Sequence, residues 1–166
     1  MLAVRRLSPT DVPAATAIVR GLPDYFTDDV PEKVARDCSD HDAWALVDSG
    51  DLIGFAIAEK RSPGGAEILW MAVRSARRGR GAGTVLLNAV LDDLATAGIS
   101  VVEVKTLDRS ADYAPYEGTR AFWEARGFVF VDTIDPLPGW QPGNPCAIYV
   151  AALRPTRRGS ASDPPL

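Results

Sequence analysis

The sequence predicts a mixed α/β fold, in which a single sheet has helices on both faces. Two observations lead to this fold class. Three strand-like runs follow one another across short turns between residues 43 and 73, which predicts an antiparallel meander. The third run, a helix and a further strand then follow within about 40 residues, the pattern of a βαβ crossover between parallel strands. The predicted sheet is therefore antiparallel in its first half and parallel in its middle.

The chain begins with a strand and a helix. Residues 3–7 predict the first strand. Residues 8–11 (SPTD) predict a helix start, because serine, threonine and aspartate cap helix N-termini, and Pro13 suits the first turn. Gly21 ends this helix. A loop rich in aromatic and acidic residues follows at 24–32.

A second helix and the meander occupy the next part of the chain. Pro31 opens the helix, which runs toward Asp40. The turns DSGD and RSPGGA separate the three runs of the meander, at residues 43–47, 52–58 and 67–73. The third run, EILWMAV, is nearly continuous in apolar character, which is typical of a strand in the middle of a sheet.

The second half of the chain supplies the crossover helix and the last strands. Apolar residues recur at helical spacing on one face of an amphipathic helix, at Leu87, Val90, Leu91 and Leu94. Gly98 ends this helix. The remaining predicted elements are a strand at 100–106, a short helix at 119–126 and two strands at 128–134 and 146–152.

We expect one domain followed by a tail. A chain of 166 residues is long enough for one well-buried core and too short for two comfortable ones. Residues 1–153 contain all the predicted elements. Residues 154–166 have no apolar periodicity and are expected to form a disordered tail.

Composition and charge argue against several classes of function. The net charge of −4 disfavours a nucleic-acid-binding protein, because such domains are usually basic along a whole face. No stretch approaches the roughly 20 apolar residues of a membrane span, and the N-terminus lacks a secretory signal, so we expect a cytoplasmic protein without a membrane partner. His41, Cys38 and Cys146 lack metal-ligand spacing, so no metal site is expected.

An unusual basic and glycine-rich run, RRGRGAG, occupies residues 77–83. It is not a Walker loop, which needs a lysine after its last glycine, and it fails the dinucleotide fingerprint Gly-x-Gly-x-x-Gly in both registers. It instead joins a strand to the N-terminus of a long helix, where free N–H groups attract anions. Glycines let a ligand approach the backbone, and arginines bind phosphates. The run therefore predicts a diphosphate site.

The residues around this run resemble the GCN5-related N-acetyltransferase (GNAT) family. The family's acyl-CoA motif, Arg/Gln-x-x-Gly-x-Gly/Ala, is matched by residues 78–83, and the wider match covers MAVRSARRGRGAGTVLL (71–87). FWEARGF (122–128) resembles the family's second marker, Phe/Leu-Tyr-Glu-x-x-Gly-Phe. The resemblance covers residues 3–152 and implies a GNAT-like acyl-CoA acyltransferase fold.

The resemblance implies a site for acetyl-CoA, as co-substrate, between the strands at 67–73 and 100–106. The pyrophosphate would lie on the N–H groups of residues 79–84, and the pantetheine arm would run along residues 71–73 like an added strand. An N–H group of that strand would polarise the thioester carbonyl. The expected cofactor-binding residues are Met71, Ala72, Val73, Arg78, Gly79, Arg80, Gly81, Ala82, Gly83 and Thr84.

Acetyl transfer to an amine needs a base, because an alkyl amine with a pKa of about 10.4 is almost fully protonated at neutral pH. Glu67 stands 11 residues before Arg78, where the histone-acetylating branch of the family has its catalytic glutamate. The alternative is a solvent-facing glutamate at the end of a strand. Strict alternation along the strand would place Glu67, Leu69 and Met71 on one face and Ile68, Trp70 and Ala72 on the other.

The family's usual general acid is a tyrosine, and Trp123 stands at that position here. An indole is not a useful proton donor to a thiolate. Tyr116, seven residues earlier, is the expected acid. The alternative is that Tyr116 only orders its loop and that solvent protonates the thiolate.

The expected activity is direct transfer of an acetyl group, through a ternary complex, to a primary amine of a small molecule. In the family, the region between the first two helices walls the acceptor site. The acidic and aromatic loop at 24–32 would favour a cationic amine there, unless it is an ordinary solvated loop. Residues 136–146 would form the other wall. A polyamine, an aminoglycoside, an amino acid and a protein N-terminus all fit these features.

Two further expectations follow from the resemblance. The alternative function is a non-catalytic acyl-CoA-binding module with a regulatory or interaction role, which the replacement of the usual tyrosine by Trp123 favours. A homodimer is the second expectation, because pairing through sheet edges or the last strands is common in the family.

Overall fold

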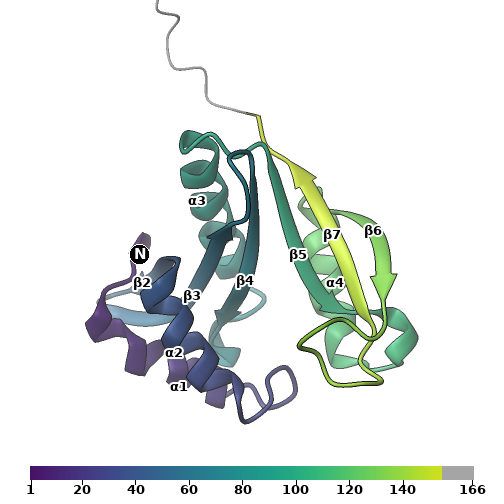
Figure 1. Cartoon of the computed structure of the whole chain (residues 1–166). Helices are drawn as coiled ribbons and strands as arrows, with labels where there is room; N and C mark the ends of the chain where they lie inside the picture. Colours follow the sequence, from purple (N-terminus) through teal and green to yellow (C-terminus); the bar gives the residue numbers. More distant parts are fainter. Residues whose placement is uncertain (155–166) are drawn as a thin grey trace, which may run out of the picture.

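The structure is a computed structural model that describes residues 1–154, so nearly all of the predicted tail lies outside the described residues. One sheet of seven strands runs through this part of the chain (Figure 1). The strands are β1 (Leu2–Arg6), β2 (Asp42–Asp48), β3 (Asp51–Lys60), β4 (Gly65–Val73), β5 (Val101–Leu107), β6 (Val129–Ile134) and β7 (Cys146–Ala152). The helices are α1 (Val12–Arg20), α2 (Val30–Asp40), α3 (Ala82–Thr96) and α4 (Pro115–Ala125).

The strand order confirms the predicted fold class. Strands β1 to β4 form an antiparallel meander, and β4 then pairs with β5 in parallel, across the crossover helix α3. The last strand, β7, inserts between β5 and β6 and is antiparallel to both. The sheet is therefore mixed, with its only parallel pair in the middle.

Helices cover both faces of the sheet, as predicted (Figure 1). Helices α1 and α2 pack on one face, in a cluster that includes Ile18, Val34 and Phe55. Helices α3 and α4 pack on the other, where Leu86, Val90 and Trp123 join strand residues in a second cluster. We refer to these as the α1/α2 face and the α3/α4 face.

The two central strands separate along their length. Parallel pairing joins Gly65–Ile68 of β4 to Val101–Val104 of β5 and stops there. Strand β4 continues to Val73 and β5 to Leu107, and in Figure 1 the two strands diverge downward from their paired ends. We call this opening the splay and its paired end the apex. The second half of β4 therefore has a sheet partner, β3, on one side only.

A bulge in β4 corrects the predicted alternation of its side chains. Ile57 of β3 lies opposite Trp70 and Ala58 lies opposite Ile68, so Leu69 is an extra residue. Beyond it the side chains change faces. Leu69, Trp70 and Ala72 all join the α1/α2 cluster, whereas Ile68, Met71 and Val73 join the other. The prediction that put Met71 on the same face as Leu69 was wrong, because it assumed an uninterrupted strand.

Helix α4 starts earlier than the predicted helix at 119–126. Pro115 occupies the first turn, where its fixed φ and missing N–H are tolerated, and Ala114 is the N-cap. Tyr116 therefore lies in the first turn of a helix. The sequence prediction had placed it in a loop.

Candidate active site

The glycine run forms a tight loop that leads from the end of β4 into α3. Gly79 and Gly81 have φ values of +73° and +78°, which side chains rarely adopt, and Gly81 is the N-cap of α3. A Cβ on either glycine would meet nothing within 4 Å, so backbone conformation explains these glycines and crowding does not. The first N–H groups of α3 lack carbonyl partners within the helix and are available to an anion.

Gly83 has a different role, because it lies against α4. A Cβ built on Gly83 would stand 3.1 Å from the Phe122 ring and 3.8 Å from the Met71 methyl carbon. The absence of a side chain therefore allows α3, α4 and β4 to approach one another beside the splay. Any larger residue at this position would have to displace Phe122.

The arginines of the loop divide into engaged and exposed ones. Arg77 forms an ion pair with Asp48 at 2.7 Å. Arg78 donates from Nε to the Val73 carbonyl at 3.2 Å and lies 4.4 Å above the Tyr25 ring. Arg74 and Arg80 are exposed, and among residues 1–154 neither forms an ion pair. Arg78 and Arg80 are the predicted phosphate ligands, and the structure keeps both free of carboxylates within that part of the chain.

Sequence reasoning missed Arg126, which α4 brings to the first turn of α3. Its Nε donates to the Thr84 hydroxyl at 3.0 Å, its Nη1 donates to the Phe122 carbonyl at 3.0 Å, and its guanidinium lies 3.9 Å above the Phe122 ring. The sequence places Arg126 42 positions after Thr84. Its position within FWEARGF was the only signal available.

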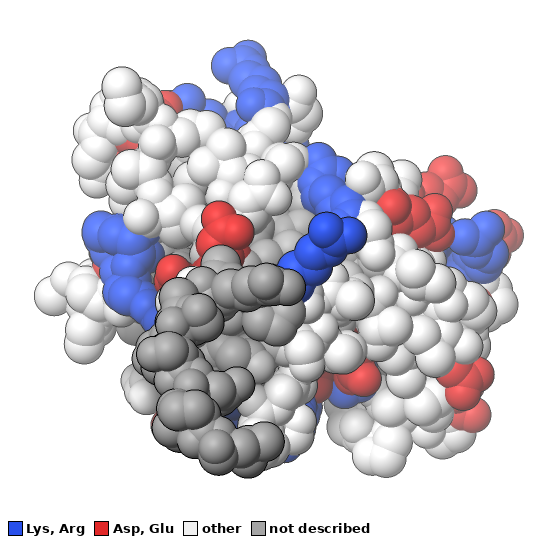
Figure 2. Space-filling view, turned by 90° about the horizontal axis from the view of Figure 1, so that it is seen from above, with Lys and Arg blue, Asp and Glu red and all other residues white. Residues whose placement is uncertain are grey.

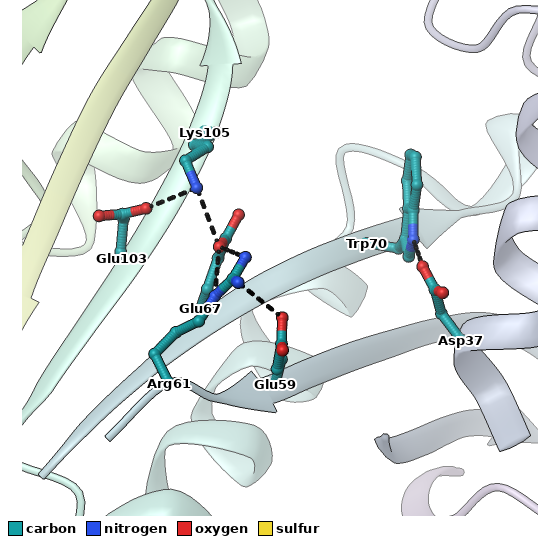
Figure 3. A network of polar contacts seen from close by, with 7 residues as sticks. All are labelled: Asp37, Glu59, Arg61, Glu67, Trp70, Glu103 and Lys105. Atoms are coloured by element: carbon teal, nitrogen blue, oxygen red, sulfur yellow. Dashed lines mark hydrogen bonds and ion pairs between the residues drawn. The ribbon is translucent and has the colours of Figure 1, made fainter. Parts of the chain in front are cut away.

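Glu67 lies at the apex of the splay and is 5 % exposed, so it is not the solvent-facing residue of the alternative interpretation. Its Oε2 accepts from Arg61 Nε at 3.0 Å and from Lys105 Nζ at 2.9 Å (Figure 3). The hydrogen bonds found within residues 1–154 leave its other oxygen, Oε1, without a donor. One carboxylate oxygen thus holds two cations, and the other remains available to a further group.

The cations around Glu67 extend into a network across three strands. Arg61 also pairs with Glu59 at 3.1 Å, and Lys105 also pairs with Glu103 at 2.9 Å (Figure 3). Burial lowers the pKa of Lys105, but hydrogen bonds from Nζ to Glu103 and Glu67 outweigh this effect and raise it. The hydrogen bonds to Glu67 likewise raise the pKa of Arg61. Both cations therefore keep their charge at neutral pH.

Tyr116, the predicted acid, donates its hydroxyl to the Tyr25 carbonyl at 2.6 Å. Burial, with smaller contributions from Tyr113 and Tyr25, raises the pKa of Tyr116 to about 12. The phenol therefore carries its proton at neutral pH. Trp123, at the family's tyrosine position, is buried and packs edge-on against Phe128 and Phe122, with ring centroids about 5 Å apart.

Aromatic side chains of the α1–α2 loop turn inward toward β4. Phe26 meets Trp70 edge-on at 6.3 Å between ring centroids. Trp70 donates its indole N–H to the buried Asp37 carboxylate of α2 at 2.7 Å (Figure 3). These contacts fix the aromatic part of the predicted acceptor wall against the bulged strand.

The acids of the same loop face solvent. Asp24, Asp28 and Asp29 are exposed, and Asp29 pairs with Lys33 at 2.6 Å. Hydrogen bonds from Lys33 and from the Thr27 hydroxyl lower the pKa of Asp29 to about 2. Seen from above, basic and acidic side chains are interspersed on the surface, in keeping with the small net charge of −4 (Figure 2).

Two structural features bear on the other predicted properties. Within residues 1–154, no three or more histidine, cysteine, aspartate or glutamate side chains gather in an arrangement that could hold a metal ion. In the same part of the chain, no helix combines the length and apolar character needed to cross a membrane. Burial raises the pKa of each thiol, Cys38 and Cys146, to about 11.

Comparison with known proteins places this geometry in a family. The model of the acetyltransferase (GNAT) family matches residues 14–128, more than half of the chain. None of the curated protein sequences matches the chain.

Several solved structures share the fold at low sequence identity. The ribosomal-protein-S18-alanine N-acetyltransferase of Escherichia coli is 19 % identical, with a TM-score of 0.77 over 98 % of this chain and 100 % of that one. A GNAT family acetyltransferase from Elizabethkingia anophelis with acetyl-CoA bound is 16 % identical, with a TM-score of 0.68 over 92 % and 98 %. An aminoglycoside 6'-N-acetyltransferase complexed with coenzyme A is 20 % identical, with a TM-score of 0.72 over 93 % and 99 %.

The family match spans the meander, the glycine loop, the crossover helix and the FWEARGF segment, which are the parts that build the splay and its rim. The structural neighbours share the whole arrangement of sheet and helices. This chain belongs to the GNAT acetyltransferase family.

Proposed function

We propose that this protein is an N-acetyltransferase, which moves the acetyl group of acetyl-CoA directly to a primary amine of a small molecule within a ternary complex. The observation that carries the proposal is the splay. Two parallel strands separate beyond Ile68 and Val104, and one of them leads directly into a glycine loop at a helix N-terminus. That arrangement offers a strand edge for an extended arm and N–H groups for a pyrophosphate.

The cofactor would occupy the residues named from the sequence. Residues 79–84 would hold the pyrophosphate through backbone N–H groups, with Arg78 and Arg80 adding charge. Residues 71–73 have no strand partner on the splay side, so their backbone can pair with the pantetheine arm. A β4 N–H group would donate to the thioester oxygen as negative charge develops on it. The acetyl-CoA and coenzyme A bound in two structural neighbours support this assignment.

Glu67 is the proposed general base. Its Oε1 carries no hydrogen bond from residues 1–154, and it lies at the apex of the splay, on the face that α1 and α2 cover. The proton of the acceptor ammonium would pass to this oxygen, directly or through water, and the free amine would then attack the thioester carbonyl. Arg61 and Lys105 would fix the orientation of the carboxylate through Oε2.

Tyr116 is the proposed general acid. Its raised pKa keeps the phenol protonated at neutral pH, so that it has a proton to give to the leaving thiolate. In the structure this proton is directed to the Tyr25 carbonyl. The proposal therefore requires the hydroxyl to turn from Tyr25 toward the coenzyme sulfur when the complex forms.

A second candidate is a non-catalytic acyl-CoA-binding module. Two observations favour it: Trp123, at the usual tyrosine position, is packed in the core, and one oxygen of Glu67 is held by two cations. Such a module would bind acetyl-CoA but would form no acetylated product with any amine.

Calorimetric titration of acetyl-CoA tests the site, and thiol release with a panel of amines tests the activity. Gly83→Trp should abolish binding, because even a Cβ there meets Phe122 at 3.1 Å. Gly118→Trp is the matched control, since Gly118 lies on α4 with nothing within 4 Å of its Cβ position. Wild-type binding without thiol release would favour the non-catalytic module. Absence of wild-type binding would contradict both functions.

A further inference from the structure

One buried hydroxyl of the structure has no hydrogen-bond partner. Thr106 is 4 % exposed, and its Oγ1 is the single buried side-chain nitrogen or oxygen of residues 1–154 that lacks a partner. Buried polar atoms are almost always paired in folded proteins, so each exception calls for a physical reason. The reason is sought in where the hydroxyl lies.

Thr106 lies on the stretch of β5 that borders the splay. Parallel pairing with β4 ends at Val104, two residues earlier, so Thr106 has a strand neighbour on one side only, at Ala147 of β7. The alternation of β5 sends Val102, Val104 and Thr106 to the same side of the sheet. Val102 and Val104 belong to the cluster on the α3/α4 face, so the hydroxyl stands on that face.

The α3/α4 face of the splay is the face of the glycine loop. Gly83 of α3, Met71 of β4 and Phe122 of α4 meet there, and Arg126 joins α4 to the first turn of α3. The charged network of Glu67 and Lys105 lies on the opposite face, because Lys105 alternates with Thr106 along β5. A ligand reaching Thr106 would therefore arrive from the side of the phosphate loop, and the acceptor amine would arrive from the other side.

In the free protein the hydroxyl is unfavourable. Removing a hydroxyl from water without a new hydrogen bond destabilises the folded state, whereas a methyl group of similar size at the same place does not carry this cost. Valine has the shape of threonine and β-branched residues suit a strand, so the free fold has no need of the oxygen. A ligand that supplies the missing partner would explain it.

We propose that Thr106 binds the pantetheine arm of acetyl-CoA, with its Oγ1 donating a hydrogen bond to an amide carbonyl of the arm. The inference rests on the proposed function, because it takes acetyl-CoA as the occupant of the splay. The arm is a chain of amide groups separated by methylenes, and in an apolar channel its amides need partners from both walls. The edge of β4 supplies backbone groups along one wall, and Thr106 supplies a side-chain group from the other.

The test compares Thr106→Val with Thr106→Ser and the wild type. Thr106→Val should weaken acetyl-CoA binding about three- to tenfold in calorimetry, the range of one lost neutral hydrogen bond. The same variant should unfold at the same temperature as the free wild type or at a higher one, because it removes an unsatisfied hydroxyl. Thr106→Ser keeps the hydroxyl and should bind acetyl-CoA within about twofold of the wild type.

A second probe separates the arm from the rest of the coenzyme. The adenosine bisphosphate half lacks the pantetheine arm, so Thr106→Val should bind it with unchanged affinity. Equal binding of acetyl-CoA by Thr106→Val and the wild type would overturn the inference and leave the proposed function intact. Lowered thermal stability of Thr106→Val, with equal weakening for both ligands, would also overturn it, because that pattern marks a structural role. Absence of acetyl-CoA binding by the wild type would remove the proposed function and, with it, this inference.

Discussion

The two faces of the splay differ in how their polar groups are satisfied. On the α1/α2 face, Glu67 is surrounded by Arg61 and Lys105, each with a second carboxylate of its own. On the α3/α4 face, the glycine loop presents helix N–H groups and exposed arginines, and Thr106 has a hydroxyl without a partner. One face is largely complete in the free protein, and the other has groups that still need an anion and a hydrogen-bond acceptor.

The difference indicates what each face is built to receive. The network around Glu67 contains three carboxylates and two cations, so it keeps one net negative charge, which suits a cationic amine. The glycine loop has the opposite character, because its exposed guanidinium groups and helix dipole suit a pyrophosphate. The bulge at Leu69 lets one strand, β4, serve both faces.

The largest effect is expected from Glu67→Gln, which should separate the two faces most sharply. Loss of the proposed base should lower kcat/KM about 100- to 10,000-fold, while acetyl-CoA affinity stays close to the wild-type value, because Glu67 lies on the acceptor face. Steady-state kinetics and calorimetry measure the two effects.

Lys105→Met is the matched control for that experiment. It breaks the same ion pair but leaves the Glu67 carboxylate and its Arg61 partner in place. If Glu67 is a base, this variant should lose less than about tenfold in kcat/KM. Equal losses in the two variants would mean that the ion pair matters and that Glu67 is not the base.

On the other face, Arg78→Gln should weaken acetyl-CoA binding about 10- to 100-fold, because charge-assisted hydrogen bonds to phosphate are lost. The wild type should also lose more affinity at high salt than the variant, since an exposed charge contact is screened. Titration at two salt concentrations gives both results. Arg77→Gln should change affinity much less, because Arg77 is paired with Asp48; a loss equal to that of Arg78→Gln would contradict this division of the arginines.

Tyr116→Phe tests the group that joins the two sides at the mouth of the splay. We expect about a tenfold or greater fall in kcat, since general acids contribute at least that much where the leaving group needs a proton. The raised pKa of about 12 adds a pH test. Because a raised folded-state pKa keeps the phenol protonated, its contributions to rate and stability should be complete below the ordinary value of 10.0 and be lost as pH rises through about 12.

A pH–rate profile of wild type and variant measures this. Loss of wild-type activity near neutral pH that is absent from Tyr116→Phe would show that the phenol titrates much lower than its buried position implies. An unchanged kcat in Tyr116→Phe would support the view that Tyr116 only holds the Tyr25 segment.

The smallest effect is on stability and is confined to the α1/α2 face. Asp37→Ala leaves the Trp70 indole N–H without its acceptor and should lower the free energy of unfolding by about 1–3 kcal/mol. Asp40→Ala, an exposed position on the same helix, should change it by less than about 0.5 kcal/mol. Chemical denaturation measures both, and equal effects would mean that the Trp70 contact contributes nothing.

Much of the fold was predictable because it follows from local patterns. The period of Leu87, Val90 and Leu94, the glycine loop and the turn residues of the meander specify elements one at a time, and the order of elements then restricts the topology. The early start of α4 was missed although Pro115 marked it, because the acidic and tyrosine-rich residues around it suggested a loop.

The details of the site depend on contacts between distant residues and could not be read from local patterns. One extra residue, Leu69, reverses the facing of every side chain beyond it, and no letter of the sequence marks a bulge. The partners of Glu67 come from a turn and from β5, 38 residues away. The lone hydroxyl of Thr106 is visible only when its surroundings are known.

The short pairing of β4 with β5 makes the splay behave as a lever. The two wings of the sheet, β1–β4 and β5–β7, are joined edge to edge only at four residue pairs, from Gly65 with Val101 to Ile68 with Val104. The free half of β4 extends about 16 Å beyond this pivot, at about 3.3 Å per residue. A rotation of about 5° at the pivot would therefore move the far end by about 1.4 Å. Since a displacement of about 1 Å can cost about 100-fold in rate, the ion pairs at the pivot set the gauge of the whole channel.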